Sequence, residues 1–424
     1  MYSRILIAVI GLLIVPQVLF AQVDTMEDSE EIKRRIDALA QEIERLKLGE
    51  ALVEADQSRF GFGPAASKIY RTERGVSIGG YGEAVYYNYA GERDDGSSGK
   101  PDVTDLLRAI VYVGYKFNDK WLLNTEFEFE HGTTSGGAGS VSAEFVHLEY
   151  THSPAFNMRF GLLLVPMGLV NELHEPTVYM GANRPDVEKA IMPSTWRENG
   201  LGIYGDTGAI SYRAYVVNGL KGAKFSSGGL RGGRQKGGKA VSDHFALVGR
   251  ADVTPRPGFL FGGSIYYGNS GQDLARENPN VKVPTGIYEG HVDIRHSGLW
   301  FSALAAYASL GDVAALNEAL GKTGSGSVGE TLNGYYVQAG YDLLHRTVYS
   351  GQSLMPYLRF ERLNTQASVP SGYEQSTAND KGSLTLGVAY QPEPRIVFKL
   401  DYKNNSNEAD SGLDQLHLQV GYVF

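Results

Sequence analysis

The sequence predicts an all-β protein, namely a transmembrane β-barrel of about sixteen antiparallel strands. Three observations predict this fold. The last eleven residues, 414–424, alternate between apolar and polar side chains and end on an aromatic residue. From residue 77 onward, about sixteen segments of roughly ten residues show a similar alternation. The connections between these segments are alternately short and long along the chain.

The C-terminal segment shows the alternation most clearly. Every second position is apolar, namely Leu416, Leu418, Val420, Tyr422 and Phe424. Successive side chains of a strand point to opposite faces, so one face of this segment is apolar and the other is polar. Taken alone, the pattern fits an edge strand of a soluble sandwich as well as the closing strand of a barrel in lipid. The rest of the chain separates these alternatives.

Composition excludes several classes of function. The chain of 424 residues carries a net charge of −9, so it has no basic excess for binding nucleic acid. It has no cysteine, which excludes a disulfide scaffold and a cysteine-ligated metal. The histidines are scattered without metal-ligand spacing, and no local motif singles out a nucleophilic serine. We therefore expect no cofactor, no metal site and no enzymatic activity.

The N-terminal region contains a predicted signal peptide and a predicted helix. Residues 1–21 have a basic residue, a short apolar run and a small residue at the expected cleavage site, which is the form of a secretory signal peptide. Residues 22–49 are expected to form a coiled-coil helix, because apolar residues repeat alternately every four and three positions, at Ile32, Ile36, Leu39, Ile43 and Leu46. This helix either oligomerises in the periplasm, or it is a single amphipathic helix that lies on the barrel or is disordered.

A predicted linker over residues 50–75, which contains Gly61, Gly63 and Pro64, separates this helix from the barrel. The barrel domain then extends over residues 76–424. Its expected strands are 77–89, 104–117, 120–130, 140–152, 156–164, 200–206, 209–218, 242–253, 258–268, 286–296, 299–310, 332–344, 352–363, 382–391, 394–404 and 414–424.

The connections between the expected strands carry the strongest inference. Those after even-numbered strands are tight, as at residues 118–119 and 392–393. Those after odd-numbered strands are long and rich in glycine, serine and charge, as at residues 91–99 and 220–238. A barrel with periplasmic turns and outer loops produces this alternation, whereas a soluble sandwich has no reason to keep it over so many strands.

The alternation also assigns side chains to the two faces of the barrel. On 107–117 the odd-numbered residues from Leu107 to Phe117 are expected to face lipid, and on 121–130 and 394–404 alternate aromatic and aliphatic residues do the same. The opposite face is highly charged, and unpaired buried charge is very costly, so the interior must hold water, a plug or both. Expected pore-lining residues are Arg108, Lys116, Glu126, Glu128, Arg159, Arg213, Arg250, Arg359 and Lys399.

The fifth expected strand leads into an unusually long connection, residues 165–199. Its proline, tryptophan and leucine residues indicate that it packs against other parts of the protein, and loops of this length are usually functional. We expect this third outer loop to fold into the lumen and narrow the pore. Its charged residues either sort solutes by sign or anchor the loop to the wall. The candidate constriction residues are Glu172, His174, Glu175, Arg184, Lys189 and Arg197.

Several stretches resemble the phosphate-selective porin family, the O/P porins. They are Val-Pro-Met-Gly-Leu at residues 165–169, Asn-Arg-Pro at 183–185, Met-Pro-Ser-Thr-Trp-Arg-Glu-Asn-Gly at 192–200, the short helix before the barrel and the terminal Phe424. The resemblance implies a homotrimeric porin of the bacterial outer membrane with its third loop inside. Phosphate-specific members rely on a ladder of inward arginines and a cluster of lysines, whereas the expected inner face here mixes both signs of charge.

The sequence therefore predicts a porin of the bacterial outer membrane, with its N-terminal helix in the periplasm. We expect passive diffusion of small hydrophilic solutes, with some preference for anions. Its expected partners are outer-membrane lipid, small hydrophilic or anionic solutes, and two further copies of the chain. One alternative is an anion channel selective for phosphate or polyphosphate. Another, from a different class, is a plugged structural barrel whose periplasmic helix docks onto a partner.

Overall fold

The computed structural model describes residues 33–37, 54–349 and 351–424. Residues 33–37 form a short helical stretch with exposed side chains, in a compact unit separate from the barrel. The predicted signal peptide and most of the predicted coiled-coil helix lie outside the described residues.

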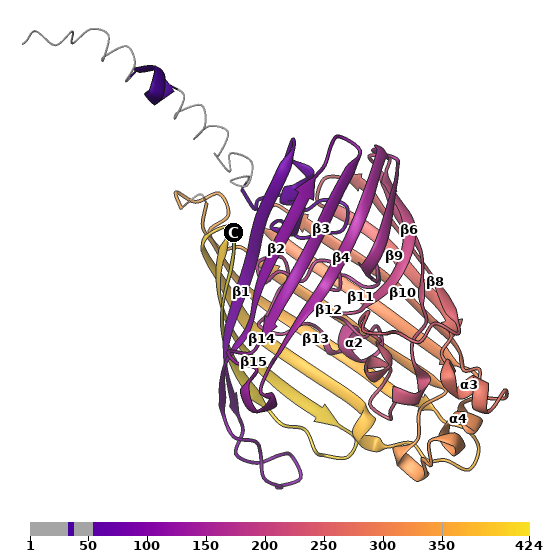
Figure 1. The fold of residues 1–424 in the computed structure, drawn as a ribbon. Helices are drawn as coiled ribbons and strands as arrows, with labels where there is room; N and C mark the ends of the chain where they lie inside the picture. The colour runs from indigo at the N-terminus through magenta and orange to yellow at the C-terminus, as the bar shows by residue number, and fades with distance from the viewer. Residues whose placement is uncertain (1–32, 38–53, 350) are drawn as a thin grey trace, which may run out of the picture. The chain divides into compact units, whose positions relative to one another are not determined.

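Sixteen antiparallel strands form a closed barrel, in which consecutive strands pair and β1 also pairs with β16 (Figure 1). This confirms the predicted fold class, and the predicted strands are present with ends shifted by a few residues. The strands are β1 (Gly75–Tyr89), β2 (Val103–Lys116), β3 (Trp121–Glu130), β4 (Ser140–Ser153), β5 (Phe156–Leu164), β6 (Arg197–Asp206), β7 (Ile210–Asn218), β8 (Phe245–Arg256), β9 (Phe259–Asn269), β10 (Pro284–His296), β11 (Leu299–Leu310), β12 (Thr331–Tyr341), β13 (Ser353–Ser368), β14 (Asp380–Glu393), β15 (Ile396–Asn407) and β16 (Gln415–Val423).

The C-terminal segment closes the barrel against β1. The register runs from Tyr81 opposite Val423 to Tyr89 opposite Gln415. One further pair of backbone hydrogen bonds joins Gly80 and Phe424, with N–O distances of 3.0 and 2.9 Å. Closure gives every strand a hydrogen-bonded neighbour on both sides, so the sheet has no edge strand.

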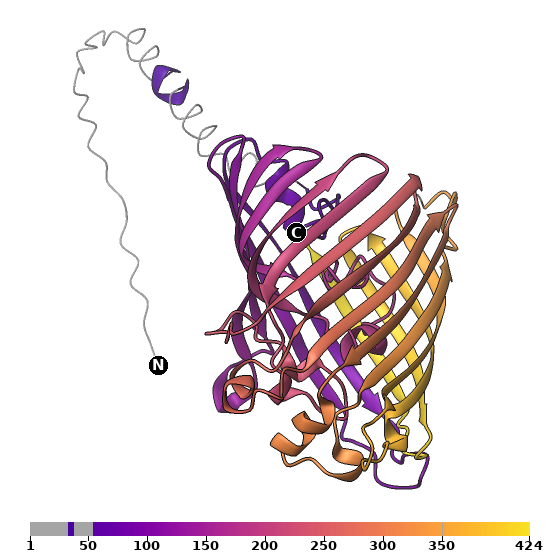
Figure 2. The same ribbon diagram turned by 90° about the vertical axis from the view of Figure 1, so that its right-hand side faces the viewer.

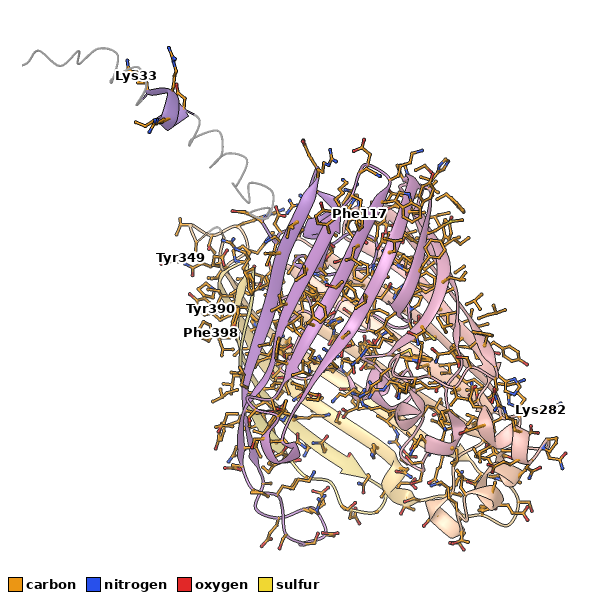
Figure 3. The ribbon with its side chains drawn as sticks, in the orientation of Figure 1. Lys33, Phe117, Lys282, Tyr349, Tyr390 and Phe398 are labelled. Atoms are coloured by element: carbon orange, nitrogen blue, oxygen red, sulfur yellow. The ribbon has the colours of Figure 1, made fainter. Side chains whose placement is uncertain are left out.

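The outer surface of the barrel carries the alternate apolar side chains that the sequence predicts. On β3 the exposed apolar residues include Phe127 and Phe129, and on β15 the exposed apolar residues are Ile396, Phe398, Leu400 and Tyr402. Phe117, Tyr390 and Phe398 are labelled on this surface (Figure 3). The intervening residues of β15, Lys399, Asp401 and Lys403, are buried in the interior. The barrel therefore has an apolar outer surface and a charged inner wall, as a strand pattern of period two requires.

A β-bulge overturns one part of this assignment. The pairing of β1 with β2 shifts between Glu83 and Ala84, so that Arg108 and Leu106 have partners on β1 and Leu107 has none. An extra residue in a strand reverses the faces of the residues beyond it. Leu106 is consequently exposed, whereas Leu107 lines a cavity in the lumen and does not face lipid as predicted.

The connections are short at one end of the barrel and long at the other. The long connections carry the helices α2 (Asp186–Ala190), α3 (Asp273–Glu277) and α4 (Val313–Ala319). Of these, α3 and α4 lie beyond the ends of the strands (Figure 2). Among the residues described, no helix is both long and apolar enough to cross a membrane. We call residues 165–196 the third outer loop and residues 219–244 the fourth outer loop.

The structure differs from the predicted linker over residues 50–75. We call residues 54–74 the N-terminal lumen segment. Within it, η1 (Ala66–Tyr70) is a short 3-10 helix that packs inside the barrel against β1, β2 and β3. The side chain of Asn124 on β3 donates a hydrogen bond to the carbonyl oxygen of Ala66 at 3.1 Å. Phe62 and Ile69 are almost fully buried in an apolar cluster with wall residues such as Phe145. The central part of the segment, residues 60–72, is thus part of the barrel interior.

Candidate functional site

The third outer loop folds into the lumen, as predicted, and its two ends are tied together. The side chain of Asn171 donates to the carbonyl oxygens of Val165 and Trp196 at 2.7 and 2.9 Å, and it accepts from the Trp196 N–H at 2.7 Å. Val165, Val187 and Trp196 are completely buried against the inner wall and neighbouring loops. The loop is therefore packed across the lumen, because this position buries its apolar side chains away from water.

The tip of this loop is hydrogen-bonded to the part of the wall formed by β13 and β15. Arg359 donates to the carbonyl oxygens of Asn183 and Met180 at 2.9 and 2.6 Å. Lys399 donates to the carbonyl oxygens of Tyr179 and Gly181 at 3.0 and 2.8 Å. Arg359 and Lys399, which the sequence places on the pore lining, are thus inward-facing residues that hold the loop in place.

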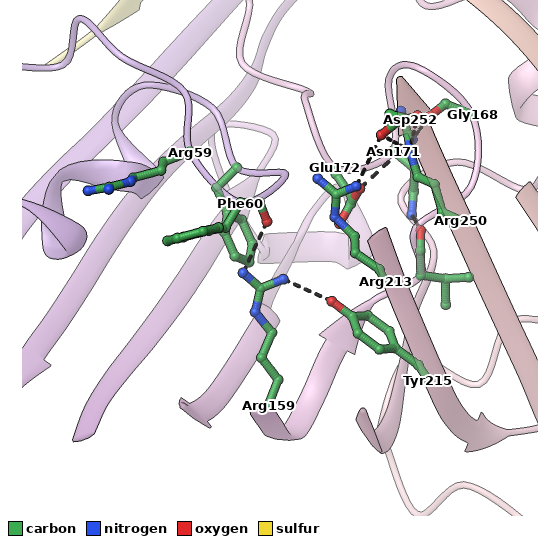
Figure 4. Close-up of polar contacts among 12 residues, drawn as sticks. Arg59, Phe60, Arg159, Gly168, Asn171, Glu172, Arg213, Tyr215, Arg250 and Asp252 are labelled. Atoms are coloured by element: carbon green, nitrogen blue, oxygen red, sulfur yellow. Dashed lines mark hydrogen bonds and ion pairs between the residues drawn. The ribbon is translucent and has the colours of Figure 1, made fainter. Parts of the chain in front are cut away.

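The acidic residues of the third outer loop are also anchors. Glu172 lies 3.2 Å from Arg213 and 3.8 Å from Arg250, and both arginines also pair with Asp252 (Figure 4). Glu188 accepts hydrogen bonds from the Val170 N–H and the Tyr336 hydroxyl at 2.9 and 2.7 Å. The ion pairs of Glu172 and the hydrogen bonds of Glu188 together fix one arrangement of the loop.

Two more predicted constriction residues face the N-terminal lumen segment and the β3 wall. Glu175 accepts hydrogen bonds from the backbone N–H groups of Ala65 and Ala66 at 3.1 Å. His174 contacts the Asn171 carbonyl oxygen at 2.9 Å and Glu126 on β3 at 3.1 Å. Burial raises the pKa of Glu175 to about 7, although the two backbone hydrogen bonds oppose this shift. Glu175 and His174 therefore attach the loop to the N-terminal lumen segment and to β3.

Arg159 on β5 joins the barrel wall to the N-terminal lumen segment. Its guanidinium group lies 2.9 Å from Glu149 and donates to the Phe60 carbonyl oxygen at 3.0 Å and the Tyr215 hydroxyl at 2.9 Å (Figure 4). The carboxylate of Glu149 also accepts from the Tyr70 hydroxyl at 2.7 Å. Lys116 lies apart from this network, as the partly buried last residue of β2 opposite Gly75.

The remaining predicted site residues meet in a cavity of about 350 Å³ between the third and fourth outer loops and the wall of β1 to β4, which we call the outer cavity. Four carboxylates line it, namely Glu83, Glu128, Glu130 and Glu144. Seven cationic side chains line it as well, namely Arg108, Arg184, Lys189, Arg197, Arg231, Arg234 and Lys236. The outer cavity therefore has more positive than negative side chains, although the whole chain is acidic.

Most cations of the outer cavity are neutralised or hydrogen-bonded in place. Arg108 lies 3.7 Å from both Glu83 and Glu128, and Arg197 lies 2.5 Å from Glu144. Arg197 is the first residue of β6, so it belongs to the wall and not to the loop in which the sequence placed it. Lys189 pairs with Asp186 within α2 at 2.9 Å.

Arg184 differs from these residues in its lack of an ion pair. The residue is only 8% exposed, and its Nη2 atom is buried without a hydrogen-bond partner, as are the Nε atoms of Arg108 and Arg197. Among the residues that the structure describes, no carboxylate forms an ion pair with it. A buried guanidinium donor without a partner is costly, so Arg184 favours an anionic or hydrogen-bond-accepting occupant of the outer cavity.

The fourth outer loop supplies residues that the sequence analysis missed. Arg234 donates to the carbonyl oxygens of Ser194 and Thr195 at 2.9 and 2.7 Å, and Arg231 also donates to Ser194. Burial and neighbouring cations lower the pKa of Arg231 to about 10 and that of Arg234 to about 9. The one available signal was the density of lysine and arginine among the glycines of residues 220–239.

Comparison with known proteins finds one relative that is similar in sequence over most of the chain. No family model matches the sequence. An uncharacterized protein of Aquifex aeolicus (strain VF5) is 37% identical over 390 residues, which cover 90% of this chain and 87% of that protein. This chain belongs to the same family. The match covers 90% of the chain, and the strands extend from Gly75 to Val423, so the match includes most of the barrel.

Solved structures share the fold of this family at low sequence identity. The outer membrane channel DcaP of Acinetobacter baumannii is 11% identical with a TM-score of 0.53, over 82% of this chain and 97% of that chain. OmpF of Salmonella typhi, in complex with daunomycin, is 12% identical with a TM-score of 0.53, over 84% and 99% of the two chains. A loop-deletion mutant of OmpT of Vibrio cholerae is 11% identical with a TM-score of 0.51, over 83% and 100%. The family therefore has a porin-like barrel fold.

Proposed function

We propose that this protein is a porin of the bacterial outer membrane through which small hydrophilic solutes diffuse passively, with a preference for anions. The observation that carries the proposal is the cationic outer cavity inside a closed barrel with an apolar outer surface. The proteins that share the fold are described as an outer membrane channel and outer membrane proteins. Transport of this kind needs a shaped, charged passage and no bond chemistry.

The charge of the outer cavity supports the anion preference. Seven cations and four carboxylates line it, and the buried Nη2 of Arg184 has no hydrogen-bond partner. An anion that enters gains from the surplus of positive charge, whereas a cation meets like charge in a region of low dielectric constant. The paired carboxylates keep this surplus moderate, so binding stays weak enough for a solute to leave.

The resemblance to the phosphate-selective porins supports further parts of the proposal. We propose that residues 1–21 are removed as a signal peptide, that residues 22–49 form a periplasmic coiled coil, and that the barrel assembles as a homotrimer in outer-membrane lipid. The clean four-three repeat from Ile32 to Leu46 supports self-association of the helix. Cross-linking of the purified protein, with and without residues 22–49, tests both the number of copies and the contribution of the helix.

Reversal potentials in planar bilayers test the anion preference. Under a potassium chloride gradient, the sign of the parent protein's reversal potential should show that chloride crosses more readily than potassium. The double variant Arg184→Ala with Lys189→Ala should bring it toward the value of an unselective pore, whereas Lys282→Ala, at an exposed position of the β9–β10 connection, should leave it unchanged. Strong anion preference that phosphate blocks, and that the double variant loses, would identify a phosphate-selective or polyphosphate-selective channel.

A plugged structural barrel is the second candidate function. The observation that favours it is the filling of the lumen by the N-terminal lumen segment together with the third and fourth outer loops. Its periplasmic helix would then dock onto a partner. Purified protein that inserts into bilayers without any steady conductance would support this candidate over the porin.

A further inference from the structure

Three cavities in the lumen meet at one side chain, that of Tyr179 in the third outer loop. Tyr179 lines the outer cavity of about 350 Å³. It also lines a cavity of about 70 Å³ beside Val170 and Trp300, and another of about 20 Å³ beside Pro176 and Lys399. Among the residues that line these three cavities, Tyr179 is the one residue common to all of them.

These cavities lie on opposite sides of the third outer loop along the barrel. The outer cavity includes Glu130 and Ser140, which end β3 and begin β4 at a long connection. The two smaller cavities share Trp300, the second residue of β11 after a short connection. The space around Tyr179 is therefore where the long-connection half of the lumen meets the short-connection half.

The two cavities on the short-connection side of Tyr179 are small. A cavity of about 20 Å³ accommodates on the order of one water molecule, and one of about 70 Å³ accommodates a few. A hydrated solute that fits in the outer cavity therefore does not fit in either of these two cavities unless side chains move. Tyr179 is only 6% exposed, so its ring fills the junction between the cavities.

The contacts of Tyr179 position the ring without locking its hydroxyl group. The hydroxyl donates to Glu83 Oε2 at 3.3 Å, which is long for an O–H···O hydrogen bond. The Lys399 ammonium lies 4.0 Å from the centre of the ring and also donates to the Tyr179 carbonyl oxygen at 3.0 Å. The backbone is thus held firmly to the wall, whereas the hydrogen bond from the hydroxyl group to Glu83 is weak.

We infer that Tyr179 is the aperture residue of the permeation path, and that the volume of its ring sets the conductance and the largest solute that crosses. This inference rests on the proposed porin function and names the residue that limits it. Rotation of the ring away from Glu83 joins the outer cavity to the inner cavities, and its return separates them. The hydroxyl has a minor part, because its hydrogen bond to Glu83 is long.

Single-channel conductance of the purified full chain in potassium chloride tests the inference. Tyr179→Ala should raise the conductance several-fold, whereas Tyr179→Phe, which keeps the ring, should leave it close to the parent value. Tyr87→Ala is the matched control, because Tyr87 also lines the outer cavity and contacts the third outer loop through Asn183 but lines neither smaller cavity. Liposome swelling with uncharged sugars of increasing size should show a larger size limit for Tyr179→Ala alone. The heat-dependent mobility of each variant in SDS gels confirms that its barrel is folded.

The outcomes separate this inference from the proposed function. A conducting parent with an unchanged Tyr179→Ala variant would overturn the role of Tyr179 and leave the porin function standing. An equal rise in Tyr87→Ala would also overturn it, because the effect would then be a general loosening of the loop. A silent parent with a conducting Tyr179→Ala variant would overturn the freely open porin and support the aperture. A silent parent and a silent variant would overturn both.

Discussion

The carboxylate of Glu175 in the third outer loop accepts a hydrogen bond from the backbone N–H of Ala66 at 3.1 Å, across 109 positions of the sequence. A second hydrogen bond comes from the N–H of Ala65, also at 3.1 Å. The loop and the N-terminal lumen segment therefore depend on each other for their positions inside the barrel. Glu175 thus connects a segment that resembles a linker in sequence to the element that narrows the lumen.

The stability of the folded barrel should depend on pH through Glu175. Burial raises the pKa of this carboxyl from 4.5 to about 7. Because the folded state holds the proton more tightly than the unfolded state, its contribution is fully present below about pH 4.5 and is lost as the pH rises through about 7. The expected loss is about 3 kcal/mol. Urea unfolding in detergent micelles at a series of pH values measures it.

The Glu175→Gln variant isolates this contribution, because glutamine keeps an acceptor and cannot ionise. Its unfolding free energy should fall less between acid and neutral pH than that of the parent. Glu188→Gln should have a similar effect, since burial also raises the pKa of Glu188 to about 7. Parallel pH profiles for the parent and both variants would contradict the prediction.

Trp196 should be a major source of stability for the third outer loop. It is completely buried, and its ring centre lies 4.9 Å from that of Tyr266. Trp196→Ala should lower the free energy of unfolding by about 3–5 kcal/mol. Trp121→Ala is the matched control, because Trp121 is 36% exposed on the outer surface and should cost less. Equal losses for the two variants would show that Trp196 is not packed as described.

Arg159 should hold the N-terminal lumen segment in the barrel. Arg159→Ala removes the partner of Glu149 and leaves a buried carboxylate without its cation, which costs about 3–5 kcal/mol. It also removes the hydrogen bond to the Phe60 carbonyl oxygen, so hydrogen exchange in residues 54–74 should become faster. Arg395→Ala breaks an exposed ion pair with Glu393 and should change neither measurement. Unchanged exchange in Arg159→Ala would refute this anchor.

Arg231 and Arg234 should contribute to anion preference, although they lie in the fourth outer loop. The double variant Arg231→Ala with Arg234→Ala should shift the reversal potential toward that of an unselective pore, because two of the seven cations of the outer cavity are lost. Lys239→Ala, an exposed position of the same loop that does not line the cavity, is the control.

A charge-preserving variant separates charge from geometry at these two positions. Arg231→Lys with Arg234→Lys retains the positive charges but loses the forked hydrogen bonds to Ser194 and Thr195. Anion preference that survives in this variant and disappears in the alanine variant would show that charge is responsible. A reversal potential that is the same in all variants would contradict the assignment.

The barrel was predictable because strand side chains alternate with a period of two and the connections alternate in length. Residues such as Phe127, Phe398 and Leu400 could be assigned to the outer face directly. The assignment failed at Leu107, because the bulge opposite Glu83 and Ala84 depends on the pairing of two strands and not on either sequence alone.

The interior was less predictable, because its contacts join distant parts of the chain. The sequence identified Arg184 and Lys189, which do line the outer cavity, but grouped them with Glu172 and Glu175, which are buried in anchoring contacts. Nothing in residues 54–74 indicated that they would be inside the barrel, because their partners are wall residues and the third outer loop. The inward path of the fourth outer loop could not be predicted from the sequence for the same reason.

The reversal potential of the purified protein in a planar bilayer, under a potassium chloride gradient, tests the central claim most directly. The account predicts a steady conductance, with a reversal potential whose sign shows that chloride crosses more readily than potassium. A steady conductance that selects potassium would contradict the role of the cationic outer cavity, and the absence of any steady conductance would contradict the porin itself.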